Sequence, residues 1–384
     1  MAEHGAGARV GVVTIIDYTN YGNRLQNYAV HEALAALGCE PVTLRNFPRA
    51  ADAEKKSWVH VGREGRPTPT GFARISRKMR SDGVWGAASA AARKLGRRIA
   101  HAEHERAIET QMALSGRRAE RFLAFSRAHV RETDFTLYLD TPTDHLDAMF
   151  DHFVVGSDQV WNPHFRGLGE IDFLTFAHPD KRVALAASFG ISAMPDEFAQ
   201  FYRERLAGFA HVSVREEAGA EIVRTLTGRE ATVTADPTMM LTPQAWGALA
   251  RRHPRQPEGL YLLTYFLGQR PPAYRRLIEE TAARHGLAVV ELNDFEAPAF
   301  YAADPPEFLG LVRDAAIVFT DSFHGAVFSV LFETPLVSFP RVDIIASMDS
   351  RLDTLFGSLG LAHRRLREDL DAAGVSALME PDYD

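Results

Sequence analysis

Four segments of the sequence place polar or charged side chains directly after a short apolar run. The runs cover residues 10–16, 153–155, 212–214 and 316–319, and their length and composition are typical of buried β-strands. In parallel α/β sheets, ligands bind beyond the carboxyl ends of the strands. The residues that follow these runs are therefore candidates for a functional site.

His324 is a candidate for proton transfer. It follows residues 316–319 and lies between Gly325 and the pair Asp321 and Ser322, either of which would cap a helix. An imidazole titrates near neutral pH, and a helix N-terminus attracts anions. His324 is therefore suited to acid–base chemistry on an anionic ligand, with a purely structural histidine as the alternative.

Two arginines are candidates for binding an anion. Arg215 directly follows residues 212–214, and Arg351 would return a second cation towards the same site. A guanidinium group binds a carboxylate or a phosphate through two parallel hydrogen bonds. The alternative for Arg215 is a structural ion pair with Glu216 or Asp236.

Hydrogen-bonding residues follow residues 153–155, with one aromatic residue among them. This concentration of hydroxyl, amide and carboxylate groups favours a polyol site, in which an indole ring would stack on a sugar or wall the pocket. An Asx-rich turn that ends at Pro163 is the alternative. The residues concerned are Ser157, Asp158, Gln159, Trp161 and Asn162.

Residues 20–26 follow the first apolar run and open a predicted helix. Gly22 permits a close approach of the backbone, and Asn23 or Asp17 would cap the helix, whose N-terminus attracts anions. The spacing matches neither the GxGxxG motif nor a P-loop, so it does not support a dinucleotide or P-loop nucleotide site. A plain capped turn between strand and helix is the alternative.

The rest of the sequence indicates no metal site and no general nucleic-acid binding. The 384 residues include a single cysteine, Cys39, and lack the His and Cys spacings of metal sites, so we expect metal-free acid–base chemistry. The net charge of −7 argues against nucleic acid as a partner. The sequence also lacks a signal-peptide pattern and a run of ~18 apolar residues, which predicts a soluble protein of a reducing cytoplasm.

Alternating strands and helices must position these segments. A strand, a helix and a strand within residues 10–45 form one βαβ unit, which requires parallel strands, and a second such series begins at the strand 260–266. We therefore predict an α/β fold with two Rossmann-like, doubly wound lobes facing a cleft. The predicted lobes are residues 1–240 and residues 241–384, the second including the terminal helices.

A basic insertion interrupts the first lobe at about residues 46–105. Its weak periodicity predicts one or two short basic helices, followed by a helix at 106–128. Residues 61–131 hold 16 Arg and Lys against 6 Asp and Glu, a net charge of +10, so the rest of the chain is near −17. This block could contact an anionic acceptor, a membrane surface or a protein partner, and a solvated basic helix is the simpler alternative.

These segments, in this order, resemble the polysaccharide pyruvyl transferase family. The resemblance covers about residues 10–361, with the insertion outside it, and is carried by NYGNRLQNYAV, VVGSDQVWNP, AASFG, SVREE, ADPTMML, YLLTYFLG, TDSFHGAVFS and MDSRL. It implies a GT-B-like fold, phosphoenolpyruvate as co-substrate without a further cofactor, and a sugar diol as acceptor. The product would be a cyclic pyruvate ketal, with release of phosphate.

The resemblance also implies roles for the candidate residues. Arg215 and Arg351 would bind the anions of phosphoenolpyruvate, and His324 would act as the acid or contact the phosphate. Some members of the family have Arg-Leu-His where this chain has Ser322-Phe323-His324, so one cation is missing here. Asp158 is predicted to be catalytic with His324 and Arg215, and the other predicted acceptor-side, binding or positioning residues are Asn23, Gln26, Ser157, Gln159, Trp161, Asn162, Asp321 and Ser322.

Two other functions are compatible with these residues. One is a GT-B glycosyltransferase that uses a nucleotide sugar, and the other is a non-catalytic protein that binds a glycan or an anion. The sequence does not distinguish a polymeric acceptor from a lipid-linked one or from the sugar of a natural product, and an oligomer is compatible with it. A lipid-linked acceptor would place the protein at the cytoplasmic membrane surface.

Overall fold

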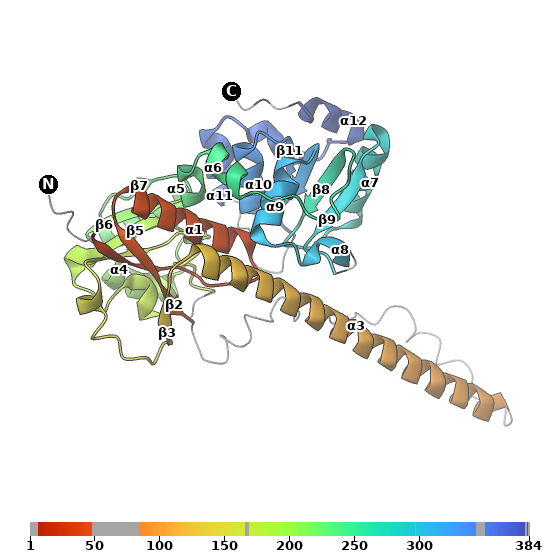
Figure 1. Ribbon diagram of the computed structural model, residues 1–384, viewed down its shortest axis with the longest axis horizontal. Helices are drawn as coiled ribbons and strands as arrows, with labels where there is room; N and C mark the ends of the chain where they lie inside the picture. The colour runs from red at the N-terminus through yellow and green to blue at the C-terminus, as the bar shows by residue number, and fades with distance from the viewer. Residues whose placement is uncertain are drawn as a thin grey trace.

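The computed structural model describes residues 7–47, 85–165, 169–295, 297–342, 350–380 and 382, and for residues 85–104, 106 and 107 it describes the backbone alone. Two parallel β-sheets form the core of the chain, as the predicted α/β fold requires (Figure 1). The chain leaves the first sheet after Val233 and enters the second at Tyr261. The two sheets confirm the prediction of two Rossmann-like units.

The first sheet has seven parallel strands in the order β3-β2-β1-β4-β5-β6-β7. Because the strand order reverses between β1 and β4, the segments after these two strands meet at the switch point, where α/β proteins bind ligands. The strands are β1 (Arg9–Val13), β2 (Glu40–Asn46), β3 (Glu132–Leu137), β4 (His152–Val155), β5 (Arg182–Ala187), β6 (His211–Val214) and β7 (Thr232–Val233).

The second sheet has four parallel strands in the order β11-β10-β8-β9, which places its switch point between β8 and β10. Successive residues of β8 enter different apolar clusters, Leu263 on one face and Leu262 on the other, because side chains alternate along a strand. Both faces are thus covered, as in a doubly wound sheet. The strands are β8 (Tyr261–Tyr265), β9 (Ala288–Leu292), β10 (Ile317–Thr320) and β11 (Leu336–Ser338).

Helices connect these strands, mostly at the predicted positions. The helices are α1 (Tyr21–Ala36), α3 (Trp85–His129), α4 (Asp196–Leu206), α5 (Glu217–Thr227), α6 (Pro243–Leu249), α7 (Pro272–His285), α8 (Pro298–Tyr301), α9 (Pro305–Arg313), α10 (Phe323–Leu331), α11 (Ser350–Ser358) and α12 (Ala372–Val375). Within the ranges that the structure covers, no helix is both long enough and apolar enough to cross a membrane.

The prediction of short helices in the insertion is wrong for residues 85–105, where the structure describes it. Residues 85–129 form the single helix α3 of 45 residues, which projects far from the two sheets (Figure 1). The alanine-rich sequence explains its length, because alanine is the strongest helix former and does not create an apolar stripe. Residues 48–84, which hold the rest of the predicted insertion and part of the basic block, lie outside the described residues. The edge strand β3 was not predicted.

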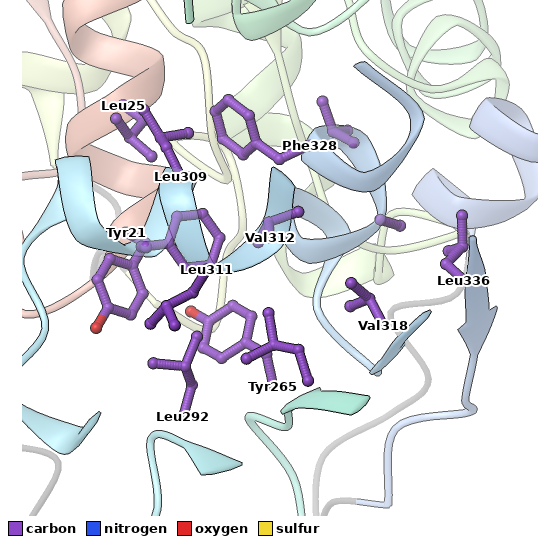
Figure 2. Packing of buried hydrophobic residues seen from close by; sticks show 14 of the residues in the cluster. Tyr21, Leu25, Tyr265, Leu292, Leu309, Leu311, Val312, Val318, Phe328 and Leu336 are labelled. Atoms are coloured by element: carbon purple, nitrogen blue, oxygen red, sulfur yellow. The ribbon is translucent and has the colours of Figure 1, made fainter. Parts of the chain in front are cut away.

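Helix α1 belongs to the first sheet by sequence but packs into the core of the second unit. Tyr21, its first residue, has no exposed surface and stacks on Phe308 of α9, with ring centroids 4.4 Å apart. Its hydroxyl donates to the carbonyl oxygen of Ala303 over 2.8 Å. Figure 2 shows Tyr21 and Leu25 beside Leu309 within this cluster. The first turn of α1 therefore joins the two units.

Arg118 of α3 strengthens the same junction. Its side chain is 2% exposed and donates to the carbonyl oxygen of Thr19, just before α1, over 2.8 Å. It also donates to the side-chain oxygen of Asn293 and to the carbonyl oxygen of Tyr301, both in the second unit. The guanidinium lies over the Tyr21 ring, 4.6 Å from its centroid. One buried cation thus links three segments that are far apart in the sequence.

Replacing Arg118 with methionine tests this junction. Arg118→Met keeps an apolar stem but leaves three acceptors without their donor, two of them in buried hydrogen bonds, so we expect the free energy of unfolding to fall by about 3 kcal/mol. Arg117→Met is the matched control, because Arg117 is exposed on the same helix and its loss should change stability by less than about 0.5 kcal/mol. Urea denaturation measures both values. Equal stabilities for the two variants would contradict the assigned role.

Candidate active site

His324 lies in the first turn of α10, directly after the switch-point strand β10. The Ser322 side chain caps this helix by accepting a hydrogen bond from the Gly325 backbone N–H over 3.3 Å, which confirms one of the two predicted caps. Gly325 fits because a Cβ there would overlap the Thr320 hydroxyl. His324 itself is 7% exposed, and its Nε2 has no hydrogen-bond partner among the described residues. The imidazole is therefore held in place with one nitrogen available.

Gly22 in the first turn of α1 forms the surface against which His324 packs. A Cβ at Gly22 would overlap the Nδ1, Cγ and Cε1 atoms of the imidazole. The glycine is therefore needed for close approach between the two units, as the sequence suggested for this turn. The cap of α1 is Asn20, whose side chain accepts from the Asn23 N–H, so the predicted caps Asn23 and Asp17 are wrong.

Asp236 is the centre of the buried charges beside His324. The Oδ2 atom of Asp236 lies 3.7 Å from His324 Nε2, is ion-paired with Arg215, and accepts from the Ser157 hydroxyl over 3.1 Å. The Oδ1 atom accepts from the N–H and the hydroxyl of Thr238. Burial raises the pKa of Asp236, but the Arg215 guanidinium and the His324 imidazole outweigh it and hold that pKa well below its usual range. Asp236 is therefore a fixed carboxylate.

Arg215 and Arg351 approach this cluster from different units. Arg215 follows β6 and is 3% exposed, and its Nε and one Nη nitrogen have no hydrogen-bond acceptor among the described residues. Arg351 is on α11 and is 8% exposed. Burial and the nearby charge of Arg215 lower the pKa of Arg351 to about 10, so both groups are charged at neutral pH. The structure thus brings the two predicted anion ligands together, and also contains the alternative pair of Arg215 with Asp236.

Asp158 lies at the solvent side of the same cluster. Its side chain is 16% exposed, compared with 1% for Arg215, whose Nη2 atom is 4.0 Å from Asp158 Oδ1. The Asn23 side chain donates to Asp158 Oδ2 over 3.2 Å. Burial raises the pKa of Asp158, and Arg215 and His324 lower it by more, so the group is held ionised. Asp158 is the predicted site residue that a ligand reaches most easily from solvent.

Gln26 and Ser157 connect the two switch-point segments of the first sheet. Gln26 of α1 accepts a hydrogen bond from the Ser157 N–H over 3.1 Å and donates to the Thr14 hydroxyl over 2.8 Å. Both Gln26 and Ser157 are fully buried. In this arrangement they position the segments after β1 and β4, which is one of the two roles predicted for Gln26.

Trp161 does not form a platform for a sugar. It has no exposed surface and stacks on Phe173, with ring centroids 5.9 Å apart, inside the core of the first unit. Its indole N–H donates to the carbonyl oxygen of Asp172. Gln159 and Asn162, predicted to bind substrate, bond to each other over 2.9 Å and are less than 10% exposed. Trp161 is therefore a core residue, and the prediction that its indole ring stacks on a sugar or walls the pocket is wrong for this arrangement.

Asp321 holds a loop and does not cap α10. Its two carboxylate oxygens accept the backbone N–H groups of Leu267 and Gly268, directly after β8. This ties together the two switch-point segments of the second sheet. Asp321 is 5% exposed, so its predicted contact with substrate is replaced by a structural role in this arrangement.

Two acidic residues of the cluster were not among the predicted site residues. Asp236 was considered only as a structural partner of Arg215, and its position after the short strand β7, before Pro237, was the available signal. Glu216 is fully buried, and its Oε1 atom accepts from the Ser188 hydroxyl and from the N–H groups of Phe189 and Gly190. Across the described residues, no group of three or more His, Cys, Asp or Glu is placed to hold a metal ion.

Substituting Gly22 tests whether the first turn of α1 positions His324. Alanine is the better helix former by about 1 kcal/mol, but at Gly22 its methyl group would displace the imidazole. We expect Gly22→Ala to lower the free energy of unfolding by about 2 kcal/mol. Gly247→Ala in α6 is the control, because no atom lies within 4 Å of a Cβ there, and it should be neutral or stabilising. A Gly22→Ala protein as stable as the control in urea would disprove the close contact.

The pKa of Asp236 predicts acid sensitivity. A carboxyl group whose pKa is lower in the folded state stabilises the fold above its unfolded pKa of about 3.9, and this stabilisation is lost as the pH falls below that value. We expect the free energy of unfolding of Asp236→Asn to fall less steeply than that of the unsubstituted protein between about pH 4 and pH 2. Asp140→Asn, at an exposed position, should keep the original slope. Urea denaturation across this pH range measures the slopes.

No curated protein matches the sequence. Among solved structures, a protein assigned as a UDP-N-acetylglucosamine 2-epimerase from Listeria monocytogenes is 9% identical, with a TM-score of 0.47, over 99% of this chain and 93% of its own. MurG of Acinetobacter baumannii is 9% identical, with a TM-score of 0.40, over 92% of this chain and 84% of its own.

The family assignment comes from the sequence. The family model described as polysaccharide pyruvyl transferase matches residues 20–341, which include α1, the segments after β4 and β6, and the first turn of α10. His324, Arg215, Asp158 and Asp236 all lie within the matched range. The chain belongs to the polysaccharide pyruvyl transferase family.

Proposed function

We propose that the protein transfers the pyruvyl group of phosphoenolpyruvate to two hydroxyl groups of a sugar, forming a cyclic ketal and releasing phosphate. Membership of the transferase family supports this reaction class. The observation that carries the proposal is the buried cluster in which His324, with Nε2 not hydrogen-bonded, lies beside Asp236 and Arg215, at the carboxyl ends of strands from both sheets. The cluster combines an acid–base group with two cations.

Phosphoenolpyruvate carries a carboxylate and a phosphate ester on the same carbon atom, so its site must supply positively charged or hydrogen-bond-donating groups. Arg215 and Arg351 are assigned to these anions, since both are charged and buried, and a guanidinium binds either group. The N-terminus of α10 adds the partial positive charge of its free N–H groups. A site with little solvent strengthens each of these interactions.

The proposed reaction balances without a further reagent. A proton is added to the methylene carbon, which makes the central carbon electrophilic, and one sugar hydroxyl oxygen bonds to that carbon. The second hydroxyl oxygen then bonds to the same carbon as its bond to the phosphate oxygen breaks. Of the two hydroxyl protons, one replaces the proton now on the methyl group and the other leaves with phosphate. No redox step and no metal are needed for this balance.

His324 is assigned to the proton transfers. Gly22 and Asp236 hold the imidazole from two sides, so that Nε2 has a fixed direction. The Asp236 carboxylate lies 3.7 Å from Nε2, the nitrogen that is assigned to deliver a proton to carbon. Asp158 is assigned to the acceptor side, because it is the more exposed carboxylate of the cluster and can accept a hydrogen bond from a sugar hydroxyl.

The acceptor is proposed to be a sugar of a polysaccharide or of its lipid-linked precursor, in keeping with the family. The protein is proposed to act in the cytoplasm.

We expect purified protein with phosphoenolpyruvate and a panel of glycans to release phosphate, and the acceptor to gain the mass of a pyruvate ketal. His324→Asn should lower this rate by about 10²- to 10⁴-fold. His152→Asn, an exposed substitution on β4, is the matched control and should leave the rate unchanged.

Calorimetric titration separates this proposal from the two other functions. A pyruvyl transferase should bind phosphoenolpyruvate and ignore the base of uridine or guanosine diphosphate, whereas a nucleotide-sugar enzyme should bind one of these nucleotides selectively. A non-catalytic binding protein should show no turnover. In that case His324→Asn should leave the affinity for the ligand unchanged. The absence of both phosphoenolpyruvate binding and turnover with every diol tested would reject the proposed function.

A further inference from the structure

The Phe323 ring contacts the two arginines and the histidine of the site. The guanidinium carbon of Arg215 is 4.5 Å from the centroid of the Phe323 ring, and that of Arg351 is 5.6 Å from the same centroid. The His324 ring meets it edge to face, with centroids 5.3 Å apart and an interplanar angle of 90°. Phe323 is 6% exposed, so all three contacts are shielded from water.

The two guanidinium groups come from different units and repel each other. Arg215 follows β6 of the first sheet, whereas Arg351 is on α11, beyond the last strand of the second. The lowered pKa of Arg351, which Arg215 helps to cause, is a sign of this repulsion. The negative face of an aromatic ring attracts a cation by about 1 kcal/mol or more when water is excluded. A single ring that attracts both groups therefore offsets part of the cost of holding them together.

A ring and a carboxylate leave different parts of a guanidinium available. A carboxylate takes up the N–H groups that would bind a ligand, as Asp236 does with one Nη of Arg215. An aromatic face attracts the cation but accepts no conventional hydrogen bond, so the N–H groups stay available in the plane of the guanidinium. The Nε and the second Nη of Arg215 have no hydrogen-bond acceptor among the described residues, so their N–H groups are available to a ligand.

Phe323 is also held in place by the start of helix α10. It is the first residue of α10, next to the Ser322 cap, and Ser322 N–H donates to the Thr320 hydroxyl over 3.0 Å. The strand β10 and the cap of α10 therefore help to fix the position of Phe323.

We propose that Phe323 is a positioning residue that sets the spacing of Arg215 and Arg351, and the orientation of His324, for a small ligand carrying a carboxylate and a phosphate. This inference rests on the proposed function for the identity of the ligand. Phe323 itself need not touch the ligand. It acts through the three side chains that contact its ring, and it makes the anion site depend on groups from both units.

Phosphoenolpyruvate binding by Phe323→Leu tests the proposal. Leucine keeps an apolar side chain but loses the π face, so we expect the dissociation constants for phosphoenolpyruvate and inorganic phosphate, measured by calorimetry, to rise about tenfold. Phe319→Leu is the matched control, because Phe319 is fully buried in the same segment and packs in an apolar cluster without cations. It should lower stability and leave anion affinity unchanged. Equal affinities for the unsubstituted protein and Phe323→Leu would overturn the proposal.

A fluorinated series covers the case in which Phe323→Leu fails to fold. Replacing Phe323 with mono-, di- and trifluorophenylalanine weakens the negative face of the ring stepwise at nearly constant shape, so affinity should fall with each fluorine. An affinity independent of fluorination would overturn the role of the π face. Failure of the unsubstituted protein to bind phosphoenolpyruvate or phosphate would overturn it as well. Binding of phosphoenolpyruvate without ketal formation on any diol would contradict only the proposed function.

Discussion

The structure depends on one close approach, between the first turn of α1 and the first turn of α10. Gly22 lies against the His324 ring there, at a separation that leaves no room for a Cβ. The approach is possible because the neighbouring Tyr21 is fully buried among aromatic residues of the second unit and bonds to Ala303. Since the strands before these helices carry the switch points of the two sheets, this contact brings the two sets of strand ends together.

Much of the fold was predictable from the sequence, because most of its elements follow local rules. Strands such as β1, β8 and β10 are short apolar runs, and α10 starts at a Ser cap before an apolar helix. Helix α3 was predicted only in part, since its alanine-rich half has no apolar stripe to distinguish it from irregular chain. The edge strand β3 has only six residues, and their burial does not alternate regularly, so no period of two distinguishes it beside a long helix.

The candidate site was predictable in its location but less so in its roles. The rule that ligands bind at strand ends identified His324, Arg215 and Asp158, which the structure brings together. The rule does not say which polar side chain faces the site and which holds a loop. Asp321 and Gln26 hold loops, because each accepts a hydrogen bond from the backbone of another segment. It also cannot reveal a partner that is distant in sequence, such as Asp236 beside His324, because that pair is formed by tertiary packing.

The charges of the cluster determine what kind of ligand it can accept. Asp158, Asp236 and Glu216 bring three carboxylates to two guanidinium groups, so the site does not carry the surplus of positive charge expected of a simple anion trap. A buried guanidinium without a nearby carboxylate would destabilise the fold, and the three carboxylates therefore offset the desolvation of the two arginines. Affinity for the proposed anionic donor must then come from directed N–H groups and the α10 N-terminus, since net charge cannot supply it. Directed N–H groups select an anion by its shape, which suits the proposed ligand, because its carboxylate and phosphate are attached to one carbon.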